Sequence, residues 1–479
     1  MSIANRAPRI VIAGLSGDSG KTLVSLALLL LARQQGIPTR AFKKGPDYID
    51  AAWLSWASGK AARNLDTFLM GGKTATRLFA THARADGLNV VEGNRGLYDG
   101  VDEIGTHSTA ELAKLLKAPV ALVVDATKAT RTVAALVLGC QTLDRHLSIR
   151  GVILNRVANP RQEAILRKAV ESICGIPVLG ALPKREAGAL PSNRHLGLVT
   201  PEEHDRLEEL RSELLALAGS RLDAARILEI AASAPAVEYF GERPSAEDAG
   251  AGLKIAYLEG SPFTFYYPDN LEALENAGAQ LEPIPALSAA SLPEDVDAMY
   301  IGGGFPETHA ARLTANAGLR SSVRQRALEG LPIYAECGGL MFLAEAIRRE
   351  GKRFPMAGVL PYEAEVFRTP QGHGYVELLV DRANPFYPVG TTIRAHEFHY
   401  SRLLSCPAAP ETACAVRRGV GTFDGRDGVL RNNVWASYAH VHAAATPKWA
   451  KGMLRAARAH AARRGAGTRR LSLASEAAW

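Results

Sequence analysis

The stretch "VIAGLSGDSGKTLVSLALLL", residues 11–30, decides the fold of the first half of this 479-residue chain. An apolar, β-branched run leads into a glycine-rich turn and then into a long apolar segment. This order predicts a buried strand, a tight loop and a helix. From Gly14 to Thr22 the pattern is G-x5-G-K-T, with one residue more between its glycines than the usual phosphate-binding loop. We therefore expect a nucleotide phosphate to bind at this turn.

Four residues of the loop are candidate ligands for ATP and Mg²⁺. Gly17 and Gly20 would let backbone N–H groups approach phosphate oxygens, and Lys21 would reach the β- and γ-phosphates. Thr22 would offer its hydroxyl to the metal ion. The N-terminus of the following helix adds a favourable dipole for the same anion.

Acidic residues at the ends of neighbouring strands are candidate partners for the metal ion. Glu92 follows the apolar run of "LNVVEGNRG", and Asp47 and Asp50 follow the strand predicted in "TRAFKKGPDYID". Open α/β sheets bind ligands at such carboxyl ends. We expect these acids to form a Mg²⁺ shell with Thr22. The lysine pair at 43–44 is open between binding an anion and lying on a solvated surface.

The chain is predicted to hold two α/β domains. Apolar strands alternate with helices through residues 1–240, which indicates a parallel sheet covered on both faces. A polar linker with Pro and Gly is expected at 241–252. A second alternating series fills 253–447, and its later strands alternate in polarity as at a mixed or antiparallel edge. The remaining residues, 448–479, form a basic tail.

Composition excludes several classes of protein. The chain is 47% hydrophobic and 22% charged, and no run reaches the ~18 apolar residues of a membrane span. The N-terminus lacks the architecture of a signal peptide. The five cysteines are scattered without a metal-type CxxC pair, which favours reduced thiols. These features predict a cytoplasmic protein without a membrane partner.

The basic character belongs to the tail alone. From residue 448 onward there are eight Lys or Arg and one acidic residue, so the tail accounts for the formal net charge of +7. We expect a solvated helix with a frayed end. Trp449 and Trp479 are the only aromatic residues in it, too few for stacking nucleic-acid bases, so no nucleic-acid partner is expected.

A second set of candidate catalytic residues is centred on "YAECGGLMFL", residues 334–343. Cys337 follows an apolar strand and precedes a predicted helix, which is the layout of a nucleophile elbow. The glycine-rich strand end "YIGGGFPE", residues 300–307, has backbone N–H groups suited to an oxyanion hole. His440 in "WASYAHVH" would activate the thiol, with His442 as a candidate for orienting it.

Two further histidines occur in "RAHEFHYS", residues 394–401. His396 and His399 are three residues apart, so on a strand they face opposite sides. That spacing is poor for a shared metal ion. We prefer a role in a substrate pocket or in the structure.

Together these motifs resemble the cobyrinic acid a,c-diamide synthase family, from residue 9 to about 445. The first half is similar to the dethiobiotin-synthetase-like ATPase domain, whose loop has the same G-x5-G-K-T spacing. Its family blocks here are "GPDYID", "EGNRGLYDG" and "RHLGL". The second half is similar to class I glutamine amidotransferase domains, through "FYYPDNLEALE", "GGGFPE", "AECGGLM", "HEFHYS" and "ASYAHVH".

The resemblance implies roles for single residues. Cys337 would be the glutaminase nucleophile, His440 its activating histidine, and Asn155 the residue that reads adenine. The wider amidotransferase group has a glutamate two residues after that histidine, where this chain has His442. The family usually has an aspartate where Glu259 stands before "FYY".

The resemblance also implies the chemistry. The first domain would activate a carboxylate of a tetrapyrrole side chain with ATP as an acyl phosphate, and ammonia from L-glutamine would displace the phosphate. The departures in "AAWLSWASG" and "KATRTVAALVLGC" are similar to the branch linked to dissimilatory sulfite reductase. They favour siroheme or sirohydrochlorin over cobyrinic acid. Trp53 and Trp56 either offer a flat face to such a ring or pack into the core.

Two other classes of function remain open at this point. One is a P-loop switch ATPase that positions other proteins, and the other is a sensor with an inactive glutaminase domain. Neither requires Cys337, the glycine-rich loop and His440 together. A homodimer is also a possible assembly.

Overall fold

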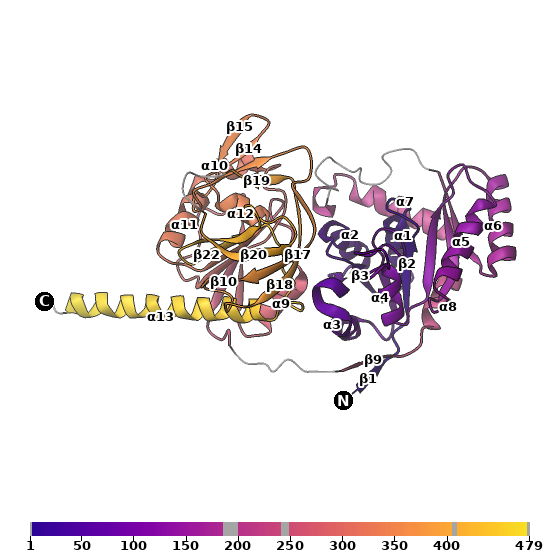
Figure 1. Cartoon of the computed structure of the whole chain (residues 1–479), viewed down its shortest axis with the longest axis horizontal. Coiled ribbons are helices and arrows are strands. Elements are labelled where there is room, and N and C mark those ends of the chain that lie inside the picture. The colour runs from indigo at the N-terminus through magenta and orange to yellow at the C-terminus, as the bar shows by residue number, and fades with distance from the viewer. Residues whose placement is uncertain (1, 185–199, 241–248, 405–409, 477–479) are drawn as a thin grey trace. The chain divides into compact units, whose positions relative to one another are not determined.

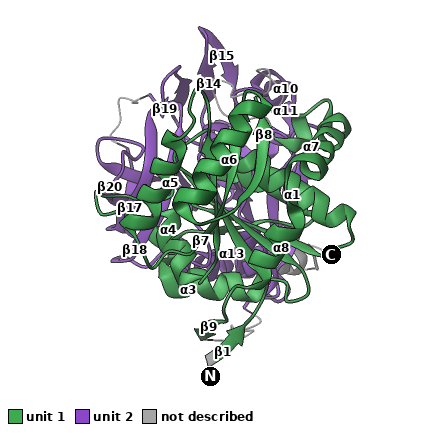
Figure 2. Cartoon of the chain, turned by 90° about the vertical axis from the view of Figure 1, so that its right-hand side faces the viewer, with its two compact units in different colours: residues 1–243 green, residues 244–479 purple. Residues whose placement is uncertain are grey.

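The computed structural model describes residues 2–184, 200–240, 249–404 and 410–476. The "RHLGL" block and residues 241–248 of the predicted linker lie outside these ranges. The chain divides into two compact units, residues 1–243 and 244–479 (Figure 2). Within the described residues, no helix is both long and apolar enough to cross a membrane.

Unit 1 is built on a parallel sheet of seven strands. Their order is β4-β3-β5-β2-β6-β7-β8, and each neighbouring pair runs in parallel. The strands are β2 (Arg9–Gly14), β3 (Thr39–Lys44), β4 (Arg63–Leu65), β5 (Leu88–Glu92), β6 (Val120–Asp125), β7 (Ile149–Val157) and β8 (Val178–Pro183). A separate antiparallel pair joins β1 (Ser2–Asn5) to β9 (Val237–Phe240).

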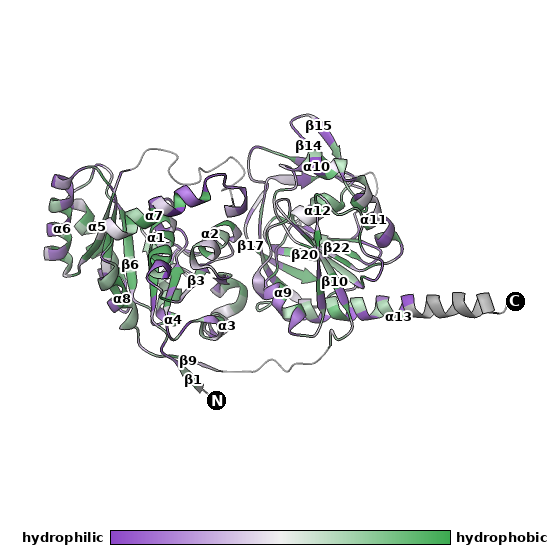
Figure 3. Cartoon of the chain, turned by 180° about the vertical axis from the view of Figure 1, so that it is seen from behind, coloured by the Kyte–Doolittle hydropathy of each residue, from purple (hydrophilic) through white to green (hydrophobic). Residues whose placement is uncertain are grey.

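Helices of unit 1 follow the strands in alternation (Figure 1). They are α1 (Lys21–Gln34), α2 (Tyr48–Ser58), α3 (Thr67–His82), α4 (Thr109–Leu115), α5 (Thr132–Leu143), α6 (Pro160–Cys174), α7 (Leu207–Arg221) and α8 (Ala224–Ala232), with a 3-10 turn at Pro201–Glu203. The apolar run of α1 lies in the core against β2, α2, α7 and α8. In Figure 3 the central strand β6 is green, whereas the outer helix α6 carries purple, polar residues.

Unit 2 has a nine-stranded mixed sheet in the order β11-β10-β12-β13-β22-β21-β20-β17-β18. The first five strands are parallel and the others antiparallel. The bounds are β10 (Lys254–Glu259), β11 (Gln280–Pro285), β12 (Ala298–Ile301), β13 (Ile333–Glu336), β17 (Gly372–Val380), β18 (Thr392–His399), β20 (Thr412–Arg418), β21 (Arg426–Arg431) and β22 (Val434–Ser437). The predicted α/β class and the antiparallel edge are both confirmed.

In the described part of unit 2, a smaller sheet and five helices accompany the nine-stranded sheet. The sheet has the order β15-β14-β16-β19, with β14 (Ala346–Arg349), β15 (Lys352–Pro355), β16 (Glu363–Val366) and β19 (Ser401–Leu403). The helices are α9 (Pro268–Glu275), α10 (Ala310–Ala315), α11 (Ala317–Leu328), α12 (Gly338–Leu343) and α13 (Lys448–Glu476).

The beginning of the basic tail is part of the core of unit 2. Trp449 and Met453 at the start of α13 are fully buried, and Leu454 and Ala457 join them in one apolar cluster. The expectation of a solvated helix is therefore wrong for its first turns. These apolar side chains recur at helical spacing, so they form a stripe that packs against the sheet.

Candidate active sites

The phosphate loop of unit 1 has the shape that its glycines predict. Gly20 has φ of 101°, a left-handed conformation that only glycine adopts readily, and it caps the N-terminus of α1. A Cβ added at Gly17 would meet no atom within 4 Å, so the backbone there stands open. Both properties suit the close approach of phosphate oxygens.

Lys21 lies over this loop. Its Nζ donates to the carbonyl oxygens of Ser16, at 2.8 Å, and Arg95, at 2.9 Å. Burial lowers the pKa of Lys21, and the neighbouring Lys43 lowers it further. A buried ammonium group that has lost its hydration and has only neutral carbonyl partners is stabilised when a polyphosphate binds beside it.

A buried charge cluster lies beside the loop, at the carboxyl ends of β3 and β5. Thr22 donates its hydroxyl to Oε1 of Glu92 at 2.9 Å. Lys43 Nζ lies 2.7 Å from the same Oε1 and 2.5 Å from Oδ2 of Asp50. Burial disfavours the charged form of Lys43, but the two carboxylates outweigh it and raise its pKa. Lys43 is thus a buried ion-pair partner, not a surface lysine.

The donors present fit a Mg²⁺ ion. Glu92 is fully buried, and within the described chain its Oε2 has no hydrogen-bond partner. Burial raises the pKa of Glu92, which marks a carboxylate that a further cation would stabilise. An unsatisfied buried oxygen beside a threonine hydroxyl is a suitable donor pair for a hard cation.

Asp47 also makes a structural contact in the loop. Its carboxylate caps α2 by accepting from the backbone N–H of Asp50 at 2.6 Å. Burial and the charge of Asp50 raise the pKa of Asp47 to about 7. The printed ion pair of Lys43 with this loop is made by Asp50, and Lys43 itself contacts Glu92.

Asn155 lies against the phosphate loop. Its Nδ2 donates to the carbonyl oxygen of Ser19 at 2.9 Å, and a Cβ at Gly20 would lie 2.2 Å from the same nitrogen. The asparagine is 5% exposed. It therefore fixes the end of the loop from β7.

The two tryptophans of α2 pack into the core of unit 1. Trp53 is 2% exposed and makes edge-to-face contacts at 5.6 Å with Trp56 and with His204. Trp56 is partly buried against the same cluster. Trp53 therefore has no free face for a ring-shaped substrate.

In unit 2, Cys337 occupies the strained turn that the sequence predicts. It has φ of 47° and ψ of −97° between β13 and α12, and it is 5% exposed. Its backbone N–H donates to the carbonyl of Ser437 at the end of β22. Burial, together with the carboxylate of Glu307, raises the pKa of the thiol. The resting cysteine is a neutral thiol that needs a base.

The glycine-rich loop contacts both the elbow and His440. A Cβ at Gly303 would lie 2.4 Å from Cε1 of His440, and a Cβ at Gly338 would lie 3.0 Å from the backbone nitrogen of Gly304. Only glycines fit this close approach. The backbone N–H of Gly304 is thus brought next to Gly338, directly after the cysteine, where an oxyanion hole requires a donor.

His440 lies three residues beyond the end of β22. It forms a backbone bridge with His396, and the two rings stack at 4.9 Å. Burial, with a further contribution from the adjacent His440 ring, lowers the pKa of His396, which keeps the His396 ring neutral. His399 stacks instead on Tyr438 at 3.7 Å. The two histidines of β18 therefore have separate local partners.

His442 has partners of its own. Its Nε2 lies 3.6 Å from Oδ2 of Asp269, and its ring packs at 4.6 Å on Tyr267. The carboxylate that approaches His440 is that of Glu336, at 3.8 Å from Nδ1. Sequence reasoning missed Glu336, although it directly precedes Cys337 in the quoted motif.

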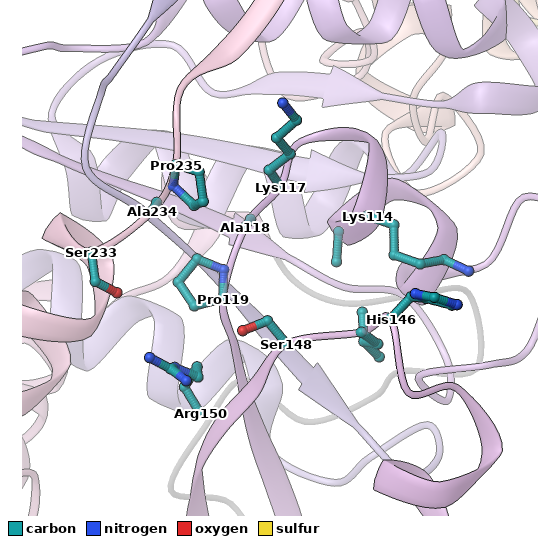
Figure 4. Close-up of a pocket in the computed structure, with 12 residues that line it drawn as sticks. Lys114, Lys117, Ala118, Pro119, His146, Ser148, Arg150, Ser233, Ala234 and Pro235 are labelled. Atoms are coloured by element: carbon teal, nitrogen blue, oxygen red, sulfur yellow. The ribbon is translucent and has the colours of Figure 1, made fainter.

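A separate cavity of about 500 Å³ lies in unit 1 away from these groups (Figure 4). It is lined by Lys114, Lys117, Pro119, Ser148 and Arg150, among others. Pro119 and Ser148 precede β6 and β7, so the cavity is at the amino end of the sheet. The phosphate loop is at the opposite, carboxyl end.

A phosphate loop with an acidic cluster on one sheet, and a cysteine elbow with a histidine on another, define a nucleotide-binding glutamine amidotransferase. Residues 10–199 match the CobQ/CobB/MinD/ParA nucleotide binding domain, and residues 254–448 match the CobB/CobQ-like glutamine amidotransferase domain.

Comparison with relatives gives the particular family. Over 450 residues the chain is 42% identical to a cobyrinate a,c-diamide synthase from Magnetococcus marinus, covering 93% of this chain and 96% of the relative. Proteins of the same name from Archaeoglobus fulgidus and Syntrophotalea carbinolica are 38% and 40% identical. They cover 91% and 92% of this chain, and 94% and 96% of their own length. The chain belongs to the cobyrinate a,c-diamide synthase family, and it is an enzyme.

Proposed function

We propose that the enzyme converts acetate carboxylates of a tetrapyrrole into amides, using ATP to activate the carboxylate and glutamine to supply ammonia. The observation that carries this proposal is the presence of both reactive centres in one chain. Lys21 and the Thr22–Glu92 pair adjoin an open phosphate loop. Cys337 is held at an elbow beside the glycine loop that contacts His440. A switch ATPase would need only the first centre.

The first step takes place in unit 1. A carboxylate oxygen of the substrate attacks the γ-phosphorus of ATP, the bond to the β,γ-bridging oxygen breaks, and ADP leaves an acyl phosphate behind. Lys21 exchanges its two carbonyl partners for phosphate oxygens and neutralises charge that develops there. Thr22 and Glu92, with Asp50 or Asp47, would hold Mg²⁺, which when bound offsets the charge of the phosphates.

The second step takes place in unit 2. The Cys337 sulfur attacks the side-chain amide carbon of glutamine after His440 accepts the thiol proton. Backbone N–H groups of the glycine loop stabilise the oxyanion. The C–N bond breaks, His440 returns the proton to the leaving ammonia, and water hydrolyses the thioester to glutamate. Ammonia displaces phosphate from the acyl phosphate and gives the amide.

Cobyrinic acid is the substrate that we propose first. Relatives that match more than nine-tenths of the chain bear the name of its a,c-diamide synthase. Siroheme and sirohydrochlorin are the second candidate, because of the departures in "AAWLSWASG" and "KATRTVAALVLGC". The buried position of Trp53 removes one argument for these flatter rings.

The test supplies each tetrapyrrole separately to purified enzyme with ATP, Mg²⁺ and glutamine. Each conversion of an acid to an amide lowers the substrate mass by about one unit, which mass spectrometry resolves. We expect two conversions on cobyrinic acid. If only siroheme or sirohydrochlorin is amidated, the proposed substrate is wrong but the proposed mechanism still holds. No amidation of any of them, with active glutamine hydrolysis, would refute the tetrapyrrole proposal.

A further inference from the structure

We infer that Glu336 is the carboxylate that positions His440 and stabilises its protonated ring while Cys337 attacks glutamine. This role rests on the proposed glutaminase function. A nucleophile and its base are commonly completed by a third group that orients the base. His442 is turned toward Asp269, whereas Glu336 lies 3.8 Å from His440 Nδ1.

Glu336 is held in place from two sides. It is the last residue of β13 and is fully buried. Tyr300 donates its hydroxyl to Oε2 at 2.9 Å, and the backbone N–H of Val441 donates to Oε1 at 3.0 Å. Two donated hydrogen bonds compensate for much of the hydration that a buried carboxylate loses. The carboxylate therefore has one well-defined orientation next to the ring.

The same hydrogen bonds fix the segment that carries His440. Asn270 donates to the carbonyl of Val441 at 2.7 Å and to the hydroxyl of Tyr300 at 3.2 Å. Its own carbonyl accepts from the backbone N–H of Ala443 at 2.7 Å. Asn270 and Tyr300 are fully buried. Glu336 and the backbone beyond His440 thus belong to one satisfied polar network, as a precise catalytic geometry requires.

The position of Glu336 fits the proton transfer. With Nδ1 facing the carboxylate, Nε2 is the nitrogen that takes the proton from the sulfur of Cys337. The ring then becomes an imidazolium, and a carboxylate at 3.8 Å stabilises that cation in a buried site. The same proton passes later to the departing ammonia, so Glu336 neither gains nor loses a proton.

If Glu336 did not act through His440, its charge would have the opposite effect on the Cys337 thiol. Burial raises the pKa of the Cys337 thiol, and the carboxylates of Glu307, Glu336 and Glu397 add to that shift. Neutralising Glu336 would then make the thiolate easier to form. If Glu336 works through His440, its loss instead removes the stabilisation of the imidazolium, and the thiolate becomes harder to form. Other titratable groups face the pair: His396 stacks on His440, and Glu336 interacts electrostatically with the tyrosines Tyr266, Tyr300, Tyr334 and Tyr387.

The experiment compares Glu336→Gln with Glu307→Gln. Alkylation of Cys337 by iodoacetamide is followed against pH by mass spectrometry of its peptide, together with glutamine hydrolysis and ammonium-dependent amidation. For Glu336→Gln we expect kcat for hydrolysis to fall at least about tenfold with little change in KM. The alkylation midpoint should move to higher pH. For Glu307→Gln the midpoint should move to lower pH.

A midpoint that is unchanged or lower in Glu336→Gln, with hydrolysis within about twofold of wild type, would overturn the inference. Ammonium-dependent amidation monitors the fold of unit 1, and thermal melting monitors the whole chain. If Glu336→Gln does not fold, Tyr300→Phe decides, because it removes one donor to Oε2 and keeps the charge. It should show a smaller effect of the same sign, and an unchanged midpoint would overturn the inference. Wild-type enzyme that does not hydrolyse glutamine would instead refute the proposed function.

Discussion

Replacing Trp449 with alanine tests whether the start of α13 is part of the amidotransferase core. The indole is fully buried and makes edge-to-face contacts with Tyr300 at 5.1 Å and Tyr334 at 5.9 Å. Truncating a buried aromatic side chain to alanine costs about 3–5 kcal/mol of stability. A typical domain has only about 5–15 kcal/mol in total. We therefore expect unit 2 to become marginally stable.

The substitution should also impair the glutaminase centre. Tyr300 packs on Trp449 with its ring and donates to Glu336 with its hydroxyl. A cavity beneath that ring loosens the group that orients His440. Glutamine-dependent turnover should fall, while ammonium-dependent turnover, which needs only unit 1, should persist.

Urea denaturation followed by loss of glutamine hydrolysis measures the stability of unit 2. With a slope near 2 kcal/mol per molar urea, a loss of 4 kcal/mol lowers the midpoint by about 2 M. Lys451→Ala on the exposed face of the same helix is the matched control, and it should change stability by less than about 0.5 kcal/mol. A loss below about 1 kcal/mol for Trp449→Ala would show that α13 does not complete this core.

Three further predictions concern the nucleotide site, the tail and pH. Lys21→Ala should abolish amidation with glutamine and with ammonium alike, and an ammonium-active variant would refute the phosphate-loop assignment. Deleting residues 462–479 removes the partly exposed Arg464–Asp297 ion pair, and turnover should stay within about tenfold of wild type, or about 1.4 kcal/mol; a larger loss would place the end of α13 in catalysis or assembly. Burial raises the pKa of Glu307 from 4.5 to about 7, so the folded state binds its proton more tightly and stability falls as pH rises from about 4.5 to 7. Glu307→Gln should therefore stabilise the protein above pH 7, by up to about 3 kcal/mol, and not near pH 4; equal effects at both pH values in thermal unfolding would contradict this.

The phosphate loop and the cysteine elbow could both be predicted from the sequence, because the residues of each short segment determine its conformation. A β-branched run followed by Gly17, Gly20 and Lys21 can hardly form anything but a strand, loop and helix. Cys337 between an apolar strand and two glycines specifies the elbow in the same way. In each case the backbone conformation and the reactive side chain lie within one short segment.

The parts that sequence reasoning missed depend on contacts between distant segments. Asp47 and Asp50 are equivalent in the sequence as acids after a strand, and only the fold shows that Asp47 caps α2 while Asp50 forms the ion pair with Lys43. The sequence makes His442 a candidate for orienting His440, but it does not show that the His442 ring contacts Tyr267 and Asp269.

The tail was misjudged for a related reason. Its basic residues suggested a solvated surface, but Trp449, Met453 and Ala457 recur every four residues. That spacing places them on one face of a helix. The apolar stripe was therefore present in the sequence, although its burial against β12 and its neighbours depends on the fold of the whole unit.

The central claim is that two centres in one chain divide the work, with unit 1 activating the carboxylate and unit 2 supplying ammonia. The most direct measurement is amidation of the tetrapyrrole by Cys337→Ala, with ATP and Mg²⁺, using either glutamine or an ammonium salt as the nitrogen source. The account predicts that glutamine-dependent amidation is lost and that ammonium-dependent amidation remains near the wild-type rate. Amidation from glutamine by the variant, or failure with both nitrogen sources in a folded protein, would contradict it.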